Sequence, residues 1–350
     1  MQCMCFAKML VLRYALSNQS RFLSNTTSIA NRFTRETLRN RLYKQELKDV
    51  HNKIRKNGFQ NVNNPQVYSD AISLRPPKDL WKALGFTVLV GTGAFTVAII
   101  SDIKRMKEKA REAASDFFKA TFKSYYDGQN QTDSFEWKRL SEGDKTAALL
   151  IGLNVVVFCL WKIRAFEPQM WRYFTNSFAQ RSLCSPMLLS AFSHSNLIHL
   201  ALNMYVVYSF TNVAIDKFFG PDQFWAFYAS AAVASSFTSL IHKAIVKSPV
   251  RALGASGAIL GLLGYVCMKI PDARLKIVFI PNFDFSAQSA IYGVLLFDIL
   301  GLVFRFRLFD HAAHLGGTLF GMFYAMYGEH LIWEQYGGLV ERWYSGLTKS

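Results

Sequence analysis

Charged residues are scarce in this 350-residue sequence, and those present are gathered in clusters. Asp, Glu, Lys and Arg together make up 18% of the chain, while apolar residues make up 51%. A soluble domain of this size interrupts its apolar runs with charges every few residues, and from residue 146 onward this chain does not. The composition therefore argues against an ordinary soluble protein and indicates a polytopic membrane protein.

Cysteines are also few and follow no pattern. The five are Cys3, Cys5, Cys159, Cys184 and Cys267, and their spacing matches neither a disulfide framework nor paired metal ligands. Internal repeats with broken helices in matching halves, which are typical of carriers, are missing as well. We therefore expect neither a disulfide-stabilised domain nor a repeat-built transporter or channel.

Acidic residues are absent from the first 35 positions, where five Lys and Arg residues lie among Ser, Thr, Asn and apolar side chains. This composition is typical of a mitochondrial transit peptide. Arg13 interrupts the apolar stretch from Leu10 to Leu16, which argues against a secretory signal. A disordered basic tail is the plainer alternative. We predict a multi-pass protein of the mitochondrial inner membrane.

The excess of basic residues gives a net charge of +16. These residues concentrate in the first hundred or so positions and in the connecting loops, without the motifs or interleaved aromatic residues of a nucleic-acid binder. We therefore interpret the charge as serving import and attraction to lipid headgroups, and we expect the lipid bilayer, not nucleic acid, as a partner.

Apolar segments dominate the rest of the sequence. One run, 84–100, stands alone after a polar stretch, and six more follow residue 145. Backbone groups in hydrocarbon must be hydrogen-bonded internally, so the runs predict helices and not strands. The fold class we predict is an all-α polytopic membrane protein, in which a six-helix core is preceded by one extra transmembrane helix. The six core segments are expected at about 146–161, 196–215, 224–241, 253–270, 287–303 and 311–327.

The predicted organisation follows from these segments and from the Pro, Gly and charge clusters between them. In chain order we expect a transit peptide (1–35), a polar N-terminal extension (36–80), the extra transmembrane helix (81–101), an amphipathic connecting segment (102–145), the six-span core (146–330) and a C-terminal tail (331–350).

Polar residues inside the spans are the main functional signal, because a bilayer tolerates them poorly. His199 and Asn203 lie in the second core segment, Ser256 in the fourth and His314 in the sixth. Helices two apart in an up-and-down bundle point the same way, so these residues are expected near one membrane face at a similar depth. His199 and Asn203 are four residues apart and share one helix face.

Ser256 and His314 have surroundings that suit a nucleophile and its base. Ser256 opens a predicted helix, whose unpaired N–H groups would stabilise an oxyanion. Gly257 and Gly317 each begin a GxxxG spacing, which favours close packing of the Ser-bearing and His-bearing helices. A lone Ser in a membrane helix is more often a packing residue, so the argument rests on the coincidence of these groups at one depth.

Over roughly residues 146–330 the sequence resembles the rhomboid proteases. The leading helix, the presequence and the run from Phe309 to Gly317 make it more similar to the mitochondrial presenilin-associated rhomboid-like subgroup than to bacterial members. The motifs that carry the resemblance are Trp171-Arg172, Phe192-Ser193-His194 with His199 and Asn203, the stretch Gly254 to Gly257, and His314 with Gly316 and Gly317.

The resemblance implies hydrolysis of single-span membrane protein substrates by a Ser-His dyad, without metal or cofactor. By motif position, Ser256 is the expected nucleophile and His314 the general base. His199, Asn203 and the Ser256 amide are expected to form the oxyanion hole. His194, Gly254, Gly257 and Gly317 are expected to support the site, and Trp171 and Arg172 to shape a loop at the lateral face.

The sequence departs from many bacterial relatives at Leu260, where they have a Tyr whose ring packs on the catalytic imidazole. The orientation of His314 must therefore come from elsewhere. Asp310 is a candidate, although we favour a loop or cap role because an acid suits a helix N-terminus. Asp298 is a costly acid within a span, expected to be protonated or paired in the bundle. His311 lacks adjacent glycines, so His314 is preferred as the base.

Two further expectations concern substrates and alternatives. The fifth core segment, 287–303, is expected to act as a lateral gate for substrate helices. The main alternative is a catalytically inactive rhomboid-like protein that binds or escorts membrane clients, and the presence of both Ser256 and His314 argues against it. The sequence predicts no oligomeric state.

Overall fold

The computed structural model describes residues 74–123, 140–276, 284–306 and 309–349. The expected transit peptide, nearly all of the polar extension and the middle of the connecting segment lie outside these residues. Cys3 and Cys5 do as well. All described residues belong to one compact unit.

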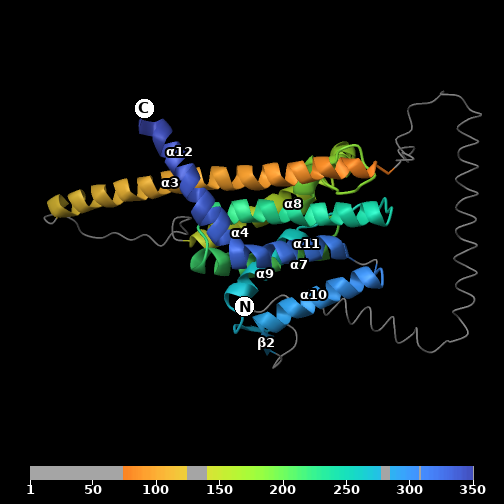
Figure 1. The fold of residues 1–350 in the computed structure, drawn as a ribbon. Coiled ribbons are helices and arrows are strands. Elements are labelled where there is room, and N and C mark those ends of the chain that lie inside the picture. Colours follow the sequence, from red (N-terminus) through yellow and green to blue (C-terminus); the bar gives the residue numbers. More distant parts are fainter. Residues whose placement is uncertain (1–73, 124–139, 277–283, 307–308, 350) are drawn as a thin grey trace, which may run out of the picture. The chain divides into compact units, whose positions relative to one another are not determined.

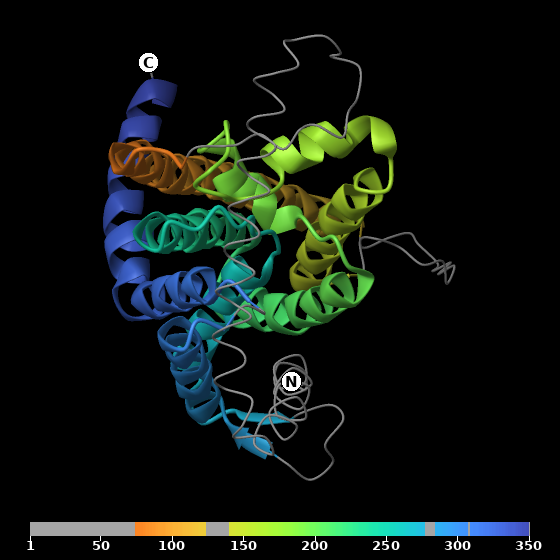
Figure 2. The same ribbon diagram turned by 90° about the vertical axis from the view of Figure 1, so that its right-hand side faces the viewer.

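The described part of the chain is built almost wholly from helices (Figures 1 and 2). The principal helices are α3 (Leu80–Lys123), α4 (Glu142–Leu160), α7 (Leu197–Lys217), α8 (Pro221–Ile245), α9 (Ser256–Lys269), α10 (Ala287–Val303), α11 (His311–Phe323) and α12 (Gly337–Lys349), with a π-helical stretch η6 (Tyr324–Tyr336) joining the last two. Shorter helical turns are η2 (Pro77–Asp79), η4 (Arg164–Phe166), α5 (Glu167–Tyr173), α6 (Ser185–Leu189) and η5 (Ser190–Phe192).

Each of the seven predicted apolar segments corresponds to one helix: the extra segment to α3, and the core segments in order to α4, α7, α8, α9, α10 and α11. Within the described part of the chain, four helices are long and apolar enough to cross a membrane: those containing 77–115, 142–160, 197–217 and 221–245. Exposed apolar side chains such as Leu89, Val156 and Leu296 line α3, α4 and α10, as expected of helices that face lipid. The protein is therefore an all-α polytopic membrane protein.

The first long helix continues well beyond the segment expected to span the membrane. α3 has 44 residues and runs without a break into the first part of the expected connecting segment. At a rise of about 1.5 Å per residue it is about 66 Å long, roughly twice the hydrocarbon thickness. Helix α3 packs along α8, and α12, the last helix of the chain, crosses α3 (Figures 1 and 2). The stretch expected as a tail, 331–349, is helical as well.

Helix α9 lies at the centre of the bundle, in contact with α7, α8, α10 and α11. It has 14 residues, which corresponds to a length of about 21 Å, less than the roughly 30 Å of hydrocarbon in a bilayer. Eleven of its residues, Gly257 to Cys267, are buried. A helix this short and this enclosed must begin or end inside the membrane profile.

Side-chain caps fix where four of the helices begin. Ser141, Asn196, Ser286 and Asp310 accept hydrogen bonds from backbone N–H groups in the first turns of α4, α7, α10 and α11. Such caps satisfy N–H groups that the helix itself leaves unpaired. Helix α9 differs, because no side-chain cap is found at its described N-terminus.

A small antiparallel hairpin precedes α10. Strands β1 (Arg274–Lys276) and β2 (Asp284–Ser286) pair Leu275 with Phe285. The apolar pattern of the sequence did not predict these strands, because each is only three residues long.

Candidate active site

Ser256 and His314 meet where α9 and α11 begin. Ser256 is the first residue of α9, and its Oγ lies 2.7 Å from Nε2 of His314, in the first turn of α11. The ring of His314 is buried, whereas Ser256 is partly accessible. A hydroxyl and an imidazole at this distance have the geometry that lets a base activate a nucleophile.

Glycines allow the two helices to come this close. A Cβ on Gly317 would overlap the carbonyl oxygen of Gly257, and a Cβ on Gly321 would overlap that of Gly261. The contact agrees with the close packing expected from the two GxxxG spacings. At Gly257 a Cβ would also collide with Ser235 on α8, so three helices meet at this position.

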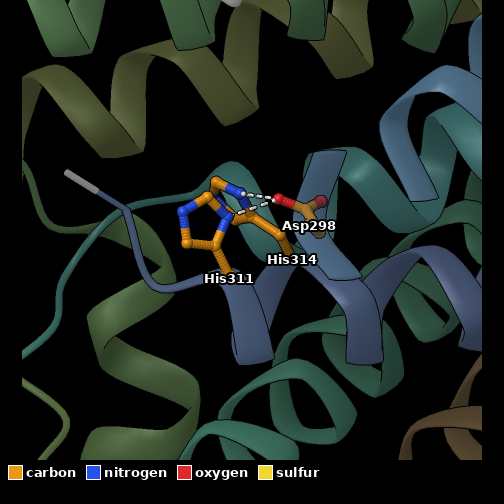
Figure 3. Close-up of side chains that lie close together, drawn as sticks. All are labelled: Asp298, His311 and His314. Carbon is orange, nitrogen blue, oxygen red and sulfur yellow. Dashed lines mark hydrogen bonds and ion pairs between the residues drawn. The ribbon is translucent and has the colours of Figure 1, made fainter. Parts of the chain in front are cut away.

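Asp298 holds the other side of His314 (Figure 3). Its Oδ1 lies 3.4 Å from Nδ1 of His314 and 2.9 Å from Nδ1 of His311. The carboxylate is fully buried, and both imidazoles are buried as well. A carboxylate accepts a hydrogen bond from Nδ1–H and so favours the tautomer of His314 whose Nε2 lone pair faces Ser256. The acid expected to be protonated or paired is therefore paired with two histidines.

An aromatic ring does lie against His314, but not from the position at which bacterial relatives supply one. The ring centroid of Phe309 lies 5.7 Å from that of His314, with the planes tilted by 36°. Leu260 is buried in the apolar core. Phe309 begins the run that contributed to the family resemblance, but its contact with His314 could not be predicted, because Phe309 precedes the helix and its ring reaches back over the imidazole.

Gly254 brings the loop before Ser256 against α7. Its φ of +137° lies in the region that favours glycine, and a Cβ there would lie 2.9 Å from Cε1 of His199. His199 therefore borders the loop that leads into the serine, on the same side of the bundle as Ser256.

His194 links Asn203 to the same loop. Nδ2 of Asn203 lies 2.9 Å from Nε2 of His194, and the N–H of Ala255 points to that same nitrogen at 3.5 Å. Both contacts are satisfied when Nε2 accepts and the His194 proton is on Nδ1. One hydrogen of the Asn203 amide is used in this way, and the second is free to bond elsewhere. His194 thereby fixes the positions of both α7 and the serine loop.

The hydrogen bonds and the ion pair described for the Asp310 side chain go to residues other than His314. The carboxylate caps α11 through the N–H of Ala313, accepts a bond of 2.5 Å from Ser239 and pairs with Lys243 at 2.9 Å. Burial alone would raise the pKa of Asp310, but the Lys243 charge and these hydrogen bonds lower it to about 2. The preference for a cap role over a triad role is confirmed. The acid that faces His314 is Asp298.

A second set of contacts holds the serine loop from the other side. Asn176 and Ala252 form an isolated antiparallel bridge, with N–H to O distances of 2.7 Å and 2.9 Å. Arg251 donates to the carbonyl of Trp171 at 2.7 Å and also reaches Thr175. The loop after α4, which contains the Trp171-Arg172 motif, is therefore tied to the segment that precedes Ser256.

Comparisons with known proteins bear on this arrangement of residues. Residues 167–330 match the family model of the rhomboid domain, and this range contains every site residue described above. The chain is 42% identical over 280 residues to the presenilin-associated rhomboid-like protein, mitochondrial, of Bos taurus, covering 79% of this chain and 74% of that protein. It is 42% identical over 278 residues to the protein of the same name from Homo sapiens, covering 78% and 73%.

A more distant relative carries the likeness beyond animals. The chain is 32% identical over 184 residues to Rhomboid protein 1, mitochondrial, of Saccharomyces cerevisiae, covering 51% of each protein. The matched domain and the extent of these relatives agree with the resemblance found in the motifs, and the chain belongs to the rhomboid family, within its mitochondrial presenilin-associated rhomboid-like group.

Proposed function

We propose that this chain is an intramembrane serine endopeptidase of mitochondria, with Ser256 as nucleophile and His314 as general base. The single observation that carries the proposal is the 2.7 Å contact between Ser256 Oγ and His314 Nε2. It lies at the start of a helix too short to cross the bilayer. Packing alone does not require both a serine and an imidazole at such a site.

The proposed reaction follows from the arrangement of protons. Nε2 of His314 takes the proton of the Ser256 hydroxyl while Oγ attacks the scissile carbonyl carbon. Nε2 then returns that proton to the departing amine as the peptide C–N bond breaks, leaving an ester on Oγ. Nε2 next takes a proton from a water molecule as the water oxygen attacks the ester carbon. It then gives that proton to Oγ as the ester C–O bond breaks, which releases the acid and restores the serine. Asp298 acts as a positioning residue for His314 and does not take the proton itself.

The oxyanion is proposed to bind where α9 begins. The uncapped N-terminus of α9 supplies the Ser256 amide, and the helix dipole favours negative charge there. His199 borders Gly254, and Asn203 retains an amide hydrogen beyond its bond to His194. These three groups are the proposed donors to the oxyanion.

Substrates are proposed to be single-span proteins of the mitochondrial inner membrane. A peptide bond within a regular helix is shielded by its own hydrogen bonds, so helix-breaking or small residues near the scissile bond would favour cleavage. Helix α10 is the proposed lateral gate. It contacts α9 and α11, yet Leu296, Ile299 and Val303 are exposed, so its outer face is open to lipid.

A catalytically inactive client-binding protein is the alternative, and nothing in the site favours it. Such a protein has no need for a base oriented by an acid against a serine, whereas Ser256, His314 and Asp298 form that series. The alternative differs from the proposal in one measurable respect, which is turnover.

The test is cleavage of a single-span substrate by the purified full chain in liposomes. We expect product with the parent protein and none with Ser256→Ala or His314→Ala. Size-exclusion profiles and helical circular dichroism matched to the parent would show that both variants remain folded. Equal cleavage by all three proteins would refute the assignment of the dyad, and binding of the substrate without cleavage by the parent would support the client-binding alternative.

A further inference from the structure

The dyad uses one imidazole, but two lie against Asp298. Nδ1 of His311 is 2.9 Å from the carboxylate oxygen, closer than the 3.4 Å of His314. His311 is 3% exposed, and its Nε2 has no hydrogen-bond partner among the described residues. The hydrolysis derived above gives this second histidine no task.

The missing side chain of Gly301 leaves space for the ring of His311. A Cβ on Gly301 would lie 2.5 Å from three atoms of the His311 ring, and Gly301 follows Asp298 by three residues on one face of α10. The rings of Phe297 and Phe309 border the imidazole, with centroids 5.3 Å and 5.9 Å away. Three potential ligands therefore converge in an apolar enclosure.

We propose that Asp298, His311 and His314 form an inhibitory site for a divalent transition metal of the Zn²⁺ class. One ligand atom from each residue lies within 4.8 Å of the others. A tetrahedral Zn²⁺ with bonds of about 2.0–2.1 Å holds its ligands about 3.4 Å apart. The spacings of 2.9 Å and 3.4 Å to Asp298 Oδ1 are close to that value. The three side chains point toward one another, with Asp298 facing both imidazoles (Figure 3).

The ligand set selects among metals. Two imidazole nitrogens and one carboxylate oxygen suit Zn²⁺ and its borderline neighbours, whereas Mg²⁺ requires octahedral oxygen ligands. The carboxylate offsets one of the two charges of the ion, and a fourth position is left for water. Three protein ligands with one open position differ from the four protein ligands of a closed structural site.

Inhibition would follow from the position of one proton. An ion on Nδ1 of His314 leaves the imidazole neutral by moving its proton from Nδ1 to Nε2, and His311 undergoes the same change. With a proton on Nε2, His314 donates to Ser256 Oγ and cannot accept from it. The general base is thereby lost while the serine, the loop and the oxyanion donors stay in place.

Metal binding is tested separately from catalysis, since the inhibitory consequence rests on the proposed function whereas binding does not. The full chain carrying Ser256→Ala keeps all three ligands and should bind one Co²⁺, with visible absorption of a tetrahedral complex that Zn²⁺ displaces and Mg²⁺ does not. His311→Gln and Asp298→Asn, each in the Ser256→Ala background, should weaken binding at least about tenfold. His330→Gln removes an exposed histidine paired with Glu334 and is the matched control.

Inhibition is then measured on the catalytically intact chain. Zn²⁺ should suppress cleavage, and the concentration for half-inhibition should rise at least about tenfold in His311→Gln whatever its own rate, but not in His330→Gln. Affinity for Co²⁺ and Zn²⁺ that is unchanged by both His311→Gln and Asp298→Asn would overturn the proposal. If the parent chain shows no cleavage at all, the proposed function fails while the binding measurements still decide the metal site.

Discussion

Asp298 Oδ1 lies 3.4 Å from His314 Nδ1, although the two residues belong to different helices. Asp298 is on α10 and His314 is on α11, so the proposed base is held by the helix proposed to admit substrates. Movement of α10 away from α11 would lengthen this contact. Under the proposed mechanism, α10 would therefore have to return before Ser256 is activated.

The first prediction concerns the charge on Asp298. Asn in its place still accepts a hydrogen bond but no longer stabilises the imidazolium that forms during the reaction. General-base catalysis contributes about 10²–10⁴-fold in total, so we expect Asp298→Asn to lower kcat about 10- to 100-fold with little change in KM.

Steady-state kinetics on a fluorogenic single-span substrate would check this prediction. Asp310→Asn is the matched control for a general loss of stability, because it keeps the cap on Ala313 but leaves Lys243 without its carboxylate. A kcat that falls equally in both variants, with the same loss of stability, would show that Asp298 acts only through general stability.

Much of this site could be predicted from the sequence, because the signals were the positions of polar residues within apolar segments. Ser256 and His314 start alternate core helices, and the structure places them in contact. That prediction needed only the order and direction of the segments. The partners of Asp298 could not be predicted in this way, because the rotation of α10 about its axis decides whether the acid faces His314 or lipid. Since α10 is apolar on all sides, the sequence does not indicate that rotation.

The contact of Phe309 with His314 and the full length of α3 could not be predicted from the sequence. Phe309 lies outside any periodic segment, and its ring reaches His314 only because the chain turns at Asp310. The continuation of α3 to Lys123 was not predicted as one helix, because the change from apolar to charged residues after Ile100 indicated a boundary. Composition locates where a helix leaves the bilayer, whereas the helix itself continues as long as its backbone remains paired.

The second prediction concerns the oxyanion donors. Loss of one such donor typically costs about 10²–10³-fold in kcat, so His199→Ala and Asn203→Ala should each lower kcat by about that factor while KM changes little. The reason is that the donors bind charge that develops only in the transition state. Asn203→Ala also releases His194, so a thermal melt must accompany the kinetics.

Matched measurements separate the two roles. Asn203→Asp keeps the size of the side chain but removes the N–H donors, and it should be at least as inactive as Asn203→Ala. Should both His199→Ala and Asn203→Ala keep the parent kcat, the oxyanion hole must be built from other groups.

The third prediction concerns the ion pair that anchors α11, in which Lys243 is buried and Asp310 is partly buried. Lys243 is 5% exposed and lies 2.9 Å from Asp310. Removing one partner of a buried pair typically costs about 3–5 kcal/mol, because the remaining charge is left uncompensated. We expect Lys243→Met to lower the free energy of unfolding by about this amount, and Lys243→Met combined with Asp310→Asn to recover most of it.

The pH dependence of this effect has a definite sign. The pKa of Asp310 is lowered from 3.8 to about 2, so the pair contributes stability above the unfolded value and loses it as pH falls through the folded value. The difference in melting temperature between parent and Lys243→Met should therefore be constant from about pH 5 to pH 8. A difference that vanishes within this range would mean that Asp310 is not charged in the folded protein.

The fourth prediction concerns the contact that brings Ser256 to His314. A methyl group at Gly317 would overlap the carbonyl of Gly257, so Gly317→Ala must push α9 and α11 apart. Overpacking of this kind costs about 1–3 kcal/mol, and a shift of about 1 Å at the reacting groups can lower activity about 10²-fold. Gly293→Ala is the matched control, since a Cβ there meets nothing within 4 Å and Ala favours a helix.

Melting temperature and cleavage rate measured together distinguish packing from chemistry. Gly317→Ala should lose activity even at temperatures where it remains folded, because the Ser256 to His314 distance depends on the separation of the two helices. Gly293→Ala should match the parent in rate and be equally or more stable. If Gly317→Ala keeps the parent rate and melting temperature, close packing of α9 and α11 at this glycine is not needed for the 2.7 Å contact between the Ser256 hydroxyl and the His314 imidazole.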